Sequence, residues 1–93
     1  MPAYVYILAS QTNGTLYTGS TTDLARRIDE HRQKVVGSFT AKHGVLRLVF
    51  AEEHPTTVSA RQREAHIKKW KRTWKIELIE RENPHWEDLA KFL

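Results

Sequence analysis

The segment YVYILASQTNGTLYTGS, from Tyr4 to Ser20, decides the fold. Its first part, up to Ala9, is rich in β-branched and aromatic residues and predicts a strand. Asn13-Gly14 is a strong turn signal because both residues tolerate positive φ. Thr15 to Ser20 predicts a second strand, so the segment forms an antiparallel hairpin. Gly19 inside that strand indicates a bulge or a close approach of another group to the backbone.

A helix and a third strand follow the hairpin. Thr22 or Asp23 can cap a helix that runs to about Val35. Val45 to Glu53 predicts the third strand, because apolar side chains recur at every second position. Pro55 ends that strand, since proline cannot donate to a sheet ladder.

Two further helices complete the chain. Thr56 or Thr57 caps a basic helix that reaches about Trp74. Asn83-Pro84 starts a final short helix, because proline is preorganised for the first helical position. That helix places its apolar residues on one stripe, namely Trp86, Leu89, Ala90 and Leu93. The order β-β-α-β-α-α predicts an α+β fold, with a three-stranded, mainly antiparallel sheet flanked by helices.

The composition is typical of one globular domain spanning residues 1–93. A chain of 93 residues with 40% hydrophobic and 28% charged residues builds one core. The absence of cysteine excludes a disulfide framework, a thiolate zinc site and a cysteine nucleophile. No apolar run is long enough to cross a bilayer, and Met1 to Leu8 lacks the features of a signal peptide. We therefore expect a cytoplasmic protein with no membrane partner.

The charge balance favours a polyanionic partner. The formal net charge is +4 and the sequence pI is about 9.6. Basic residues concentrate between Arg61 and Lys75, whereas acidic residues gather near the C-terminus. Such a distribution is typical of nucleic-acid binding, and the alternative is a basic surface without a partner.

Two polar residues lie where the first helix should be apolar. Leu24, Ile28 and Val35 define its buried stripe, and His31 lies within that stripe. Arg27 lies at its edge, four positions before His31, so the two side chains are neighbours. Such residues are candidates for chemistry. The alternative is an arginine that packs its stem and a histidine bonded to a backbone carbonyl.

The same anomaly recurs on the second helix and on the hairpin. Glu64 sits beside an apolar stripe, and a buried carboxylate needs a cation, several donors or a metal. The alternative is a surface glutamate paired with Lys68 or Arg61. Tyr6 and Tyr17 lie on the two hairpin strands, where tyrosine more often packs than reacts. The joint pattern of tyrosine, tyrosine, arginine, histidine and glutamate carries the functional hypothesis.

These residues resemble the active-site pattern of the GIY-YIG nuclease superfamily, especially its small bacterial single-domain branch, which is related to the N-terminal nuclease domain of the excision-repair machinery. The first motif matches Tyr4-Val5-Tyr6, in the run YVYIL, and the second matches Tyr17-Thr18-Gly19, in the run LYTGSTTDLARRIDEH. The run RQREAHIKKWKR carries the glutamate that matches the metal ligand of the family. Ser20 stands where some members place a lysine.

The resemblance implies a single GIY-YIG endonuclease-like domain that hydrolyses DNA phosphodiester bonds, in DNA repair or recombination. It implies catalytic roles for Tyr6, Tyr17, Arg27, His31 and Glu64, with Glu64 holding one Mg²⁺ or Mn²⁺ ion. No small-molecule cofactor is expected. The partner is DNA, duplex or branched. The expected phosphate contacts are basic residues of the second helix, namely Arg61, Lys68, Lys69, Arg72 and Lys75.

Two other interpretations are open on the sequence. One is a catalytically silent nucleic-acid-binding module of the same fold. The other is a protein-interaction domain in which Trp74 and Trp86 form a partner surface. That interpretation requires a large exposed apolar patch.

Overall fold

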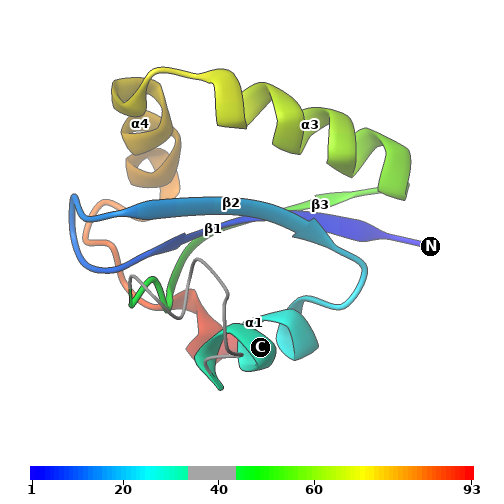
Figure 1. Cartoon of the computed structure of the whole chain (residues 1–93), viewed down its shortest axis with the longest axis horizontal. Coiled ribbons are helices and arrows are strands. Elements are labelled where there is room, and N and C mark those ends of the chain that lie inside the picture. The colour runs from blue at the N-terminus through cyan, green and yellow to red at the C-terminus, as the bar shows by residue number, and fades with distance from the viewer. Residues whose placement is uncertain (34–43) are drawn as a thin grey trace.

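A three-stranded sheet organises the chain. The computed structural model describes residues 1–33 and 44–93. The strands are β1 (Ala3–Ala9), β2 (Leu16–Thr21) and β3 (Arg47–His54), and they lie in the order β2-β1-β3 (Figure 1). Both β2 and β3 pair with β1 in antiparallel fashion. The expected α+β fold and its antiparallel sheet are therefore confirmed.

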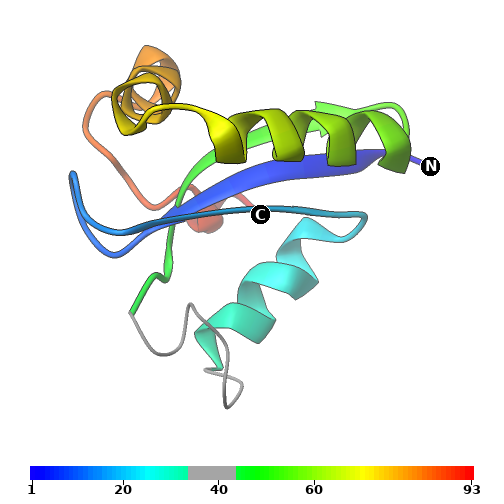
Figure 2. The ribbon, with the colours of Figure 1, turned by 45° about the horizontal axis from the view of Figure 1, so that its top comes forward.

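Helices cover both faces of this sheet. They are α1 (Leu24–Arg32), α3 (Thr57–Lys69) and α4 (Arg72–Glu82), followed by the 3-10 helix η1 (Leu89–Phe92). Figure 2 shows α1 on one side of the sheet and α3 and α4 on the other. The expected element order is confirmed, and the expected end of the first helix near Val35 lies outside the described residues. No helix in residues 1–33 and 44–93 has the length and apolar character needed to span a bilayer.

Side-chain caps fix where two of the helices begin. The Asp23 carboxylate accepts a hydrogen bond of 3.2 Å from the Arg26 backbone N–H at the start of α1. The Thr56 hydroxyl accepts one of 3.1 Å from the Ser59 N–H at the start of α3. These bonds satisfy N–H groups that a helix cannot pair internally. Of each pair of cap candidates, Asp23 and Thr56 are the residues used.

The basic helix ends earlier than the sequence predicts. The sequence predicts an end near Trp74, but α3 ends at Lys69 and Trp70 takes an extended backbone, with φ −68° and ψ 152°. A second helix, α4, then begins at Arg72. Neither glycine nor proline marks this break, so tertiary packing produces it. Trp70 packs against the core, and the change of direction places Leu78 and Ile79 against the sheet.

The expected helix start at Asn83-Pro84 is also wrong, because Asn83 ends α4. Its buried side-chain amide donates to the carbonyl oxygens of Val49 (3.1 Å) and Glu87 (3.0 Å). Its side-chain oxygen accepts from the Glu87 N–H at 3.0 Å. Asn83 therefore ties the C-terminal segment to β3. The expected apolar stripe does not form, since Trp86 is fully buried whereas Leu93 is exposed.

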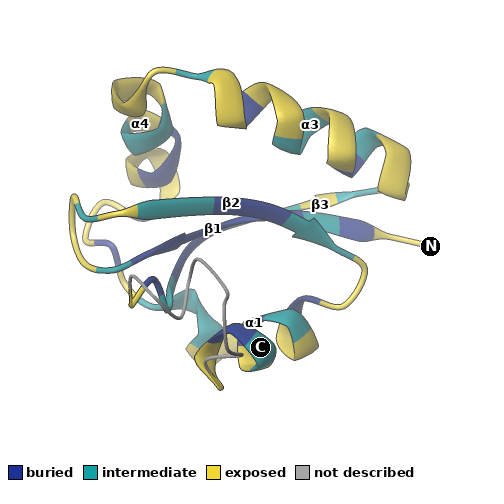
Figure 3. Cartoon of the chain, viewed as in Figure 1, coloured by how far each residue is buried: buried dark blue, intermediate teal, exposed yellow. Residues whose placement is uncertain are grey.

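The central strand β1 divides two apolar clusters, one on each face of the sheet. Val5 and Ile7 face α3 and α4 and join the larger cluster, which includes Trp86. Tyr6 and Leu8 face α1 and join the smaller cluster. Figure 3 shows buried residues along β1 and on the inner sides of the helices. Burial on both faces explains why the strand is a nearly continuous apolar run.

Candidate active site

The candidate site lies at the β2 edge of the sheet, around Gly19. In the strand register Gly19 is the direct partner of Tyr6. A Cβ atom placed on Gly19 would lie 2.6 Å from the Tyr6 hydroxyl and 2.7 Å from its Cζ. Glycine therefore leaves the space in which the Tyr6 phenol lies across β2. The expectation of a close approach at this position is confirmed, and the register irregularity lies instead between β1 and β3.

The Tyr6 hydroxyl links two residues of α1. The Nε of Arg27 donates a hydrogen bond of 3.4 Å to the phenol oxygen. The same hydroxyl lies 3.0 Å from His31 Nε2. Because the phenol oxygen accepts from Arg27, its proton is available for His31 Nε2, which then accepts. This assignment places the imidazole proton on Nδ1.

Tyr17 closes the other side of this group. It pairs with Leu8 in the sheet, so its ring lies on the α1 face beside Tyr6. The ring centroids of Tyr17 and His31 are 5.2 Å apart, and those of Tyr17 and Tyr6 are 6.3 Å apart. The structure thus brings Tyr6, Tyr17, Arg27 and His31 into one cluster.

Glu64 reaches the β2 edge from the opposite face of the sheet. Ser20 follows Gly19 in β2 and pairs with Val5, so it lies on the α3 side. Its hydroxyl donates a 2.5 Å hydrogen bond to Glu64 Oε1. The other oxygen, Oε2, lies 2.7 Å from the Lys68 ammonium. The surface pairing of Glu64 with Lys68, one of the alternatives drawn from sequence, is therefore present.

The environment sets the charge of each group. Burial raises the pKa of Tyr6 to about 12, although the hydrogen bond from Arg27 favours the phenolate. Burial, and then the Arg27 charge, lowers the pKa of His31. Burial opposes ionisation of Glu64, but the bonds from Lys68 and Ser20 outweigh it and lower the pKa of this carboxyl. At neutral pH Tyr6 is protonated, His31 is neutral and Glu64 is ionised.

Glu64 is the residue that fits a metal ion. Within the described ranges, no three His, Asp or Glu side chains gather closely enough to hold a metal by themselves. Mg²⁺ needs no such cluster, because it binds through one or two carboxylates and keeps water and substrate phosphate as its other ligands. A single ionised carboxylate at the rim of the site is compatible with that chemistry.

The five basic residues expected to bind phosphate differ in their surroundings. Lys68 pairs with Glu64, and an Arg72 guanidinium nitrogen donates to the carbonyl oxygens of Asn13 and Gly14, at 2.6 Å each. Arg72 therefore clips α4 to the hairpin loop. Lys69 is exposed on α3, and Lys75 is half-buried on α4. Arg61 lines a pocket between α1 and α3.

Ser20 is the site residue whose contact sequence reasoning missed. The sequence marks it only as the place where some relatives have lysine. A signal is present, because strand residues alternate between faces and Ser20 follows Gly19. Alternation therefore places the Ser20 hydroxyl on the face that α3 covers. The structure uses it to join the two sides of the sheet edge.

Comparison with known proteins identifies the class. The model of the GIY-YIG catalytic domain matches residues 2–77, and this chain belongs to that family of nucleases. Among its relatives are two proteins named UPF0213. The one from Streptococcus sanguinis is 36% identical over 77 residues, covering 83% of this chain and 87% of the relative. The one from Clostridium perfringens is 38% identical over 76 residues, covering 82% and 81%.

A solved structure agrees with the fold. The solution NMR structure of the UPF0213 protein BH0048 from Bacillus halodurans is 34% identical to this chain. The match covers 98% of this chain and 96% of that one, with a TM-score of 0.59. The resemblance to the small single-domain branch of the family is confirmed, and membership implies a nucleic-acid substrate.

Proposed function

We propose that this protein is a metal-dependent DNA endonuclease that hydrolyses phosphodiester bonds. The observation that carries the proposal is the arrangement at the β2 edge. A hydrogen-bonded Tyr6–His31–Arg27 group lies on one side, and an ionised Glu64 is joined to the same strand through Ser20 on the other. A phosphate between them would meet a cation, a proton acceptor and a metal-binding carboxylate.

Arg27 is proposed to stabilise the negative charge that grows on the phosphate. Its Nε is bonded to Tyr6, whereas its side chain is partly exposed and borders the pocket between α1 and α3. A guanidinium presents several donors in a plane and so suits phosphate oxygens. Hydrogen bonds to a developing oxyanion contribute most when the donors are held in place beforehand. The bond to Tyr6 supplies that preorganisation.

Tyr6 and His31 are proposed to activate the attacking water. In hydrolysis the water oxygen bonds to phosphorus, the bond to the 3′ oxygen breaks, and the water loses a proton. With a pKa of about 12, the Tyr6 phenol is a poor base by itself. Neutral His31 can take the phenol proton as the phenol oxygen takes the proton from water. Tyr17 would confine the water from the other side.

Glu64 would hold one Mg²⁺ or Mn²⁺ ion. When bound, the ion neutralises charge on the phosphate and on the leaving oxygen. For Glu64 to accept it, Lys68 must leave Oε2. The released ammonium, on the exposed face of α3, can then contact a backbone phosphate.

A second candidate function is a catalytically silent nucleic-acid-binding module. The observation that favours it is that both oxygens of Glu64 already have partners, Ser20 and Lys68. In that case Glu64 serves only to join α3 to β2. The basic composition would then account for binding without cleavage.

The deciding experiment is cleavage of labelled DNA structures by the wild type and by Glu64→Ala. The panel contains duplex, nicked, flapped and four-way branched DNA, with Mg²⁺ or with chelator. We expect wild-type cleavage with Mg²⁺ alone, and none by Glu64→Ala, which still binds DNA. Preference for branched substrates would support a role in repair or recombination. Binding without cleavage by the wild type would establish the silent module.

A further inference from the structure

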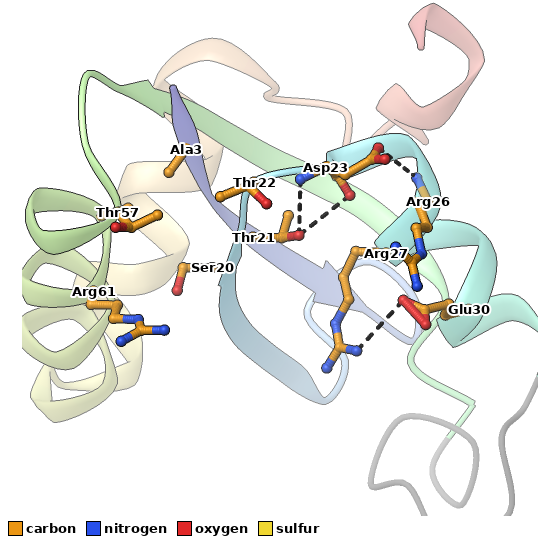
Figure 4. A pocket seen from close by; sticks show the side chains of 11 residues that line it. Ala3, Ser20, Thr21, Thr22, Asp23, Arg26, Arg27, Glu30, Thr57 and Arg61 are labelled. Carbon is orange, nitrogen blue, oxygen red and sulfur yellow. Dashed lines mark hydrogen bonds and ion pairs between the residues drawn. The ribbon is translucent and has the colours of Figure 1, made fainter. Parts of the chain in front are cut away.

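A pocket opens beside the proposed active site, between α1 and α3 at the end of β2. Its volume is about 460 Å³, and its walls include Ser20, Thr21, Thr57, Arg26, Arg27 and Arg61. Figure 4 shows Arg61 extending from α3 toward the space that Arg27 borders from α1, with Ser20 between them. Three arginines and several hydroxyls therefore surround one cavity.

The acidic residues of this pocket are already engaged. Asp23 accepts the backbone N–H of Arg26 as the cap of α1. Glu30 lies 3.7 Å from a terminal nitrogen of Arg27. In the described parts of the chain, the guanidinium groups of Arg26 and Arg61 make no hydrogen bond or ion pair. Two such cations at one pocket form a donor set that favours an anion with several oxygens.

The pocket shares two walls with the proposed active site. Ser20 bonds to Glu64, and Arg27 bonds to Tyr6. Arg61 also lies three positions before Glu64 on α3, so the two side chains are neighbours. An anion in the pocket would therefore sit next to a phosphate held at Arg27 and Glu64.

We propose that this pocket binds the backbone phosphate next to the cleaved one in the same strand, with Arg61 as its main anchor and Arg26 as a second. The proposal rests on the proposed function, because it takes the cleaved phosphate to lie at Arg27. It defines the substrate class further: a strand with at least two successive phosphates. Isolated phosphodiesters lack the second contact and bind weakly.

The test uses thymidine 3′,5′-bisphosphate, which carries two phosphates one sugar apart, and thymidine 5′-monophosphate. Affinities are measured by NMR titration of the full chain in chelator, for the wild type, Arg61→Ala and the control Arg81→Ala. Hydrogen bonds to charged groups correspond to about tenfold or more in affinity. We expect the wild type and Arg81→Ala to prefer the bisphosphate at least tenfold. In Arg61→Ala this preference should fall to about twofold or less, with an unchanged melting temperature.

Two results would overturn the pocket assignment. One is equal affinity of the wild type for both nucleotides, and the other is a full bisphosphate preference in Arg61→Ala. Since no cleavage is involved, the result is independent of the nicking assay. A bisphosphate preference without nicking would keep the pocket and reject the nuclease. Nicking without the preference would do the reverse.

Discussion

The two faces of the sheet differ in what they bury. The α3 and α4 face packs apolar side chains of the larger cluster, such as Ile67, Ile79 and Trp86, all with 0% exposure. The α1 face buries Tyr6 at 1% and His31 at 7% exposure beside its apolar residues. Both faces are equally central in the fold, yet among the described residues only the α1 face buries titratable groups in its core.

This difference separates stability from chemistry. Apolar burial contributes about 25 cal/mol per Å², so the α3 and α4 face supplies the larger share of the hydrophobic term. Buried polar groups cost free energy unless they are hydrogen-bonded, and the α1 face keeps them in a bonded network. Substitutions on the α1 face should therefore affect cleavage, whereas those on the other face should affect unfolding.

The largest expected effect on chemistry comes from Arg27→Ala. We expect cleavage to fall about 100-fold or more, because donors to a developing oxyanion contribute that much. Unfolding by urea should change little, since the Arg27 side chain is 42% exposed. Arg81→Ala, on the exposed side of α4, serves as the control. Normal cleavage by Arg27→Ala would show that this arginine only packs.

The largest expected effect on stability comes from Ile79→Ala on the opposite face. Ile79 is fully buried, and truncating such a side chain leaves a cavity that costs about 2–5 kcal/mol. Urea titration followed by fluorescence measures this loss. Cleavage per folded molecule should stay at the wild-type rate at low temperature. A loss of rate without a loss of stability would mean that the two faces are not separate in function.

A smaller and mixed effect is expected for Gly19→Ala. The new Cβ would meet the Tyr6 hydroxyl at 2.6 Å, so the phenol must move. Overpacking of this kind costs about 1–3 kcal/mol. The displaced hydroxyl should also lose its contact with His31 and lower the cleavage rate. Unchanged rate and stability together would refute the close approach at Gly19.

The smallest effect is a shift in titration. Burial, and then Arg27, lowers the pKa of His31 below its ordinary value of 6.5. The protonated form is thus favoured in the unfolded chain, so His31 contributes stability above about pH 6.5 that is lost as pH falls through its folded pKa. NMR titration of the imidazole should give a midpoint below 6.5, rising in Arg27→Ala. A midpoint above 6.5 in the wild type would contradict the neutral imidazole.

Local sequence signals predict the hairpin and the core-facing polar residues. Asn13 takes positive φ, at 56°, as the turn signal requires. The four-residue spacing of Arg27 and His31 places both beside Tyr6, because helical periodicity depends on neighbouring residues alone. The order of elements follows from the same kind of information.

Features that depend on distant contacts are not predictable in this way. The break after α3 carries no glycine or proline, and it follows from how Trp70 packs. Asn83 before Pro84 has the pattern of a helix start, but its side chain serves a carbonyl on β3, 34 positions away. The Ser20–Glu64 bond joins residues 44 positions apart. Such pairings become visible only once the chain is folded.

The place of Tyr6 in the central strand has a consequence for hydrogen exchange. Tyr6 lies between Gly19 on β2 and Ala51 on β3, so the backbone of this strand is paired on both sides. Amides in such strands exchange only when the whole domain opens. Local fraying at the termini or in the hairpin loop would therefore leave the phenol and its partners in register. The proposed catalytic group would be among the last parts of the chain to lose its native position as the protein unfolds.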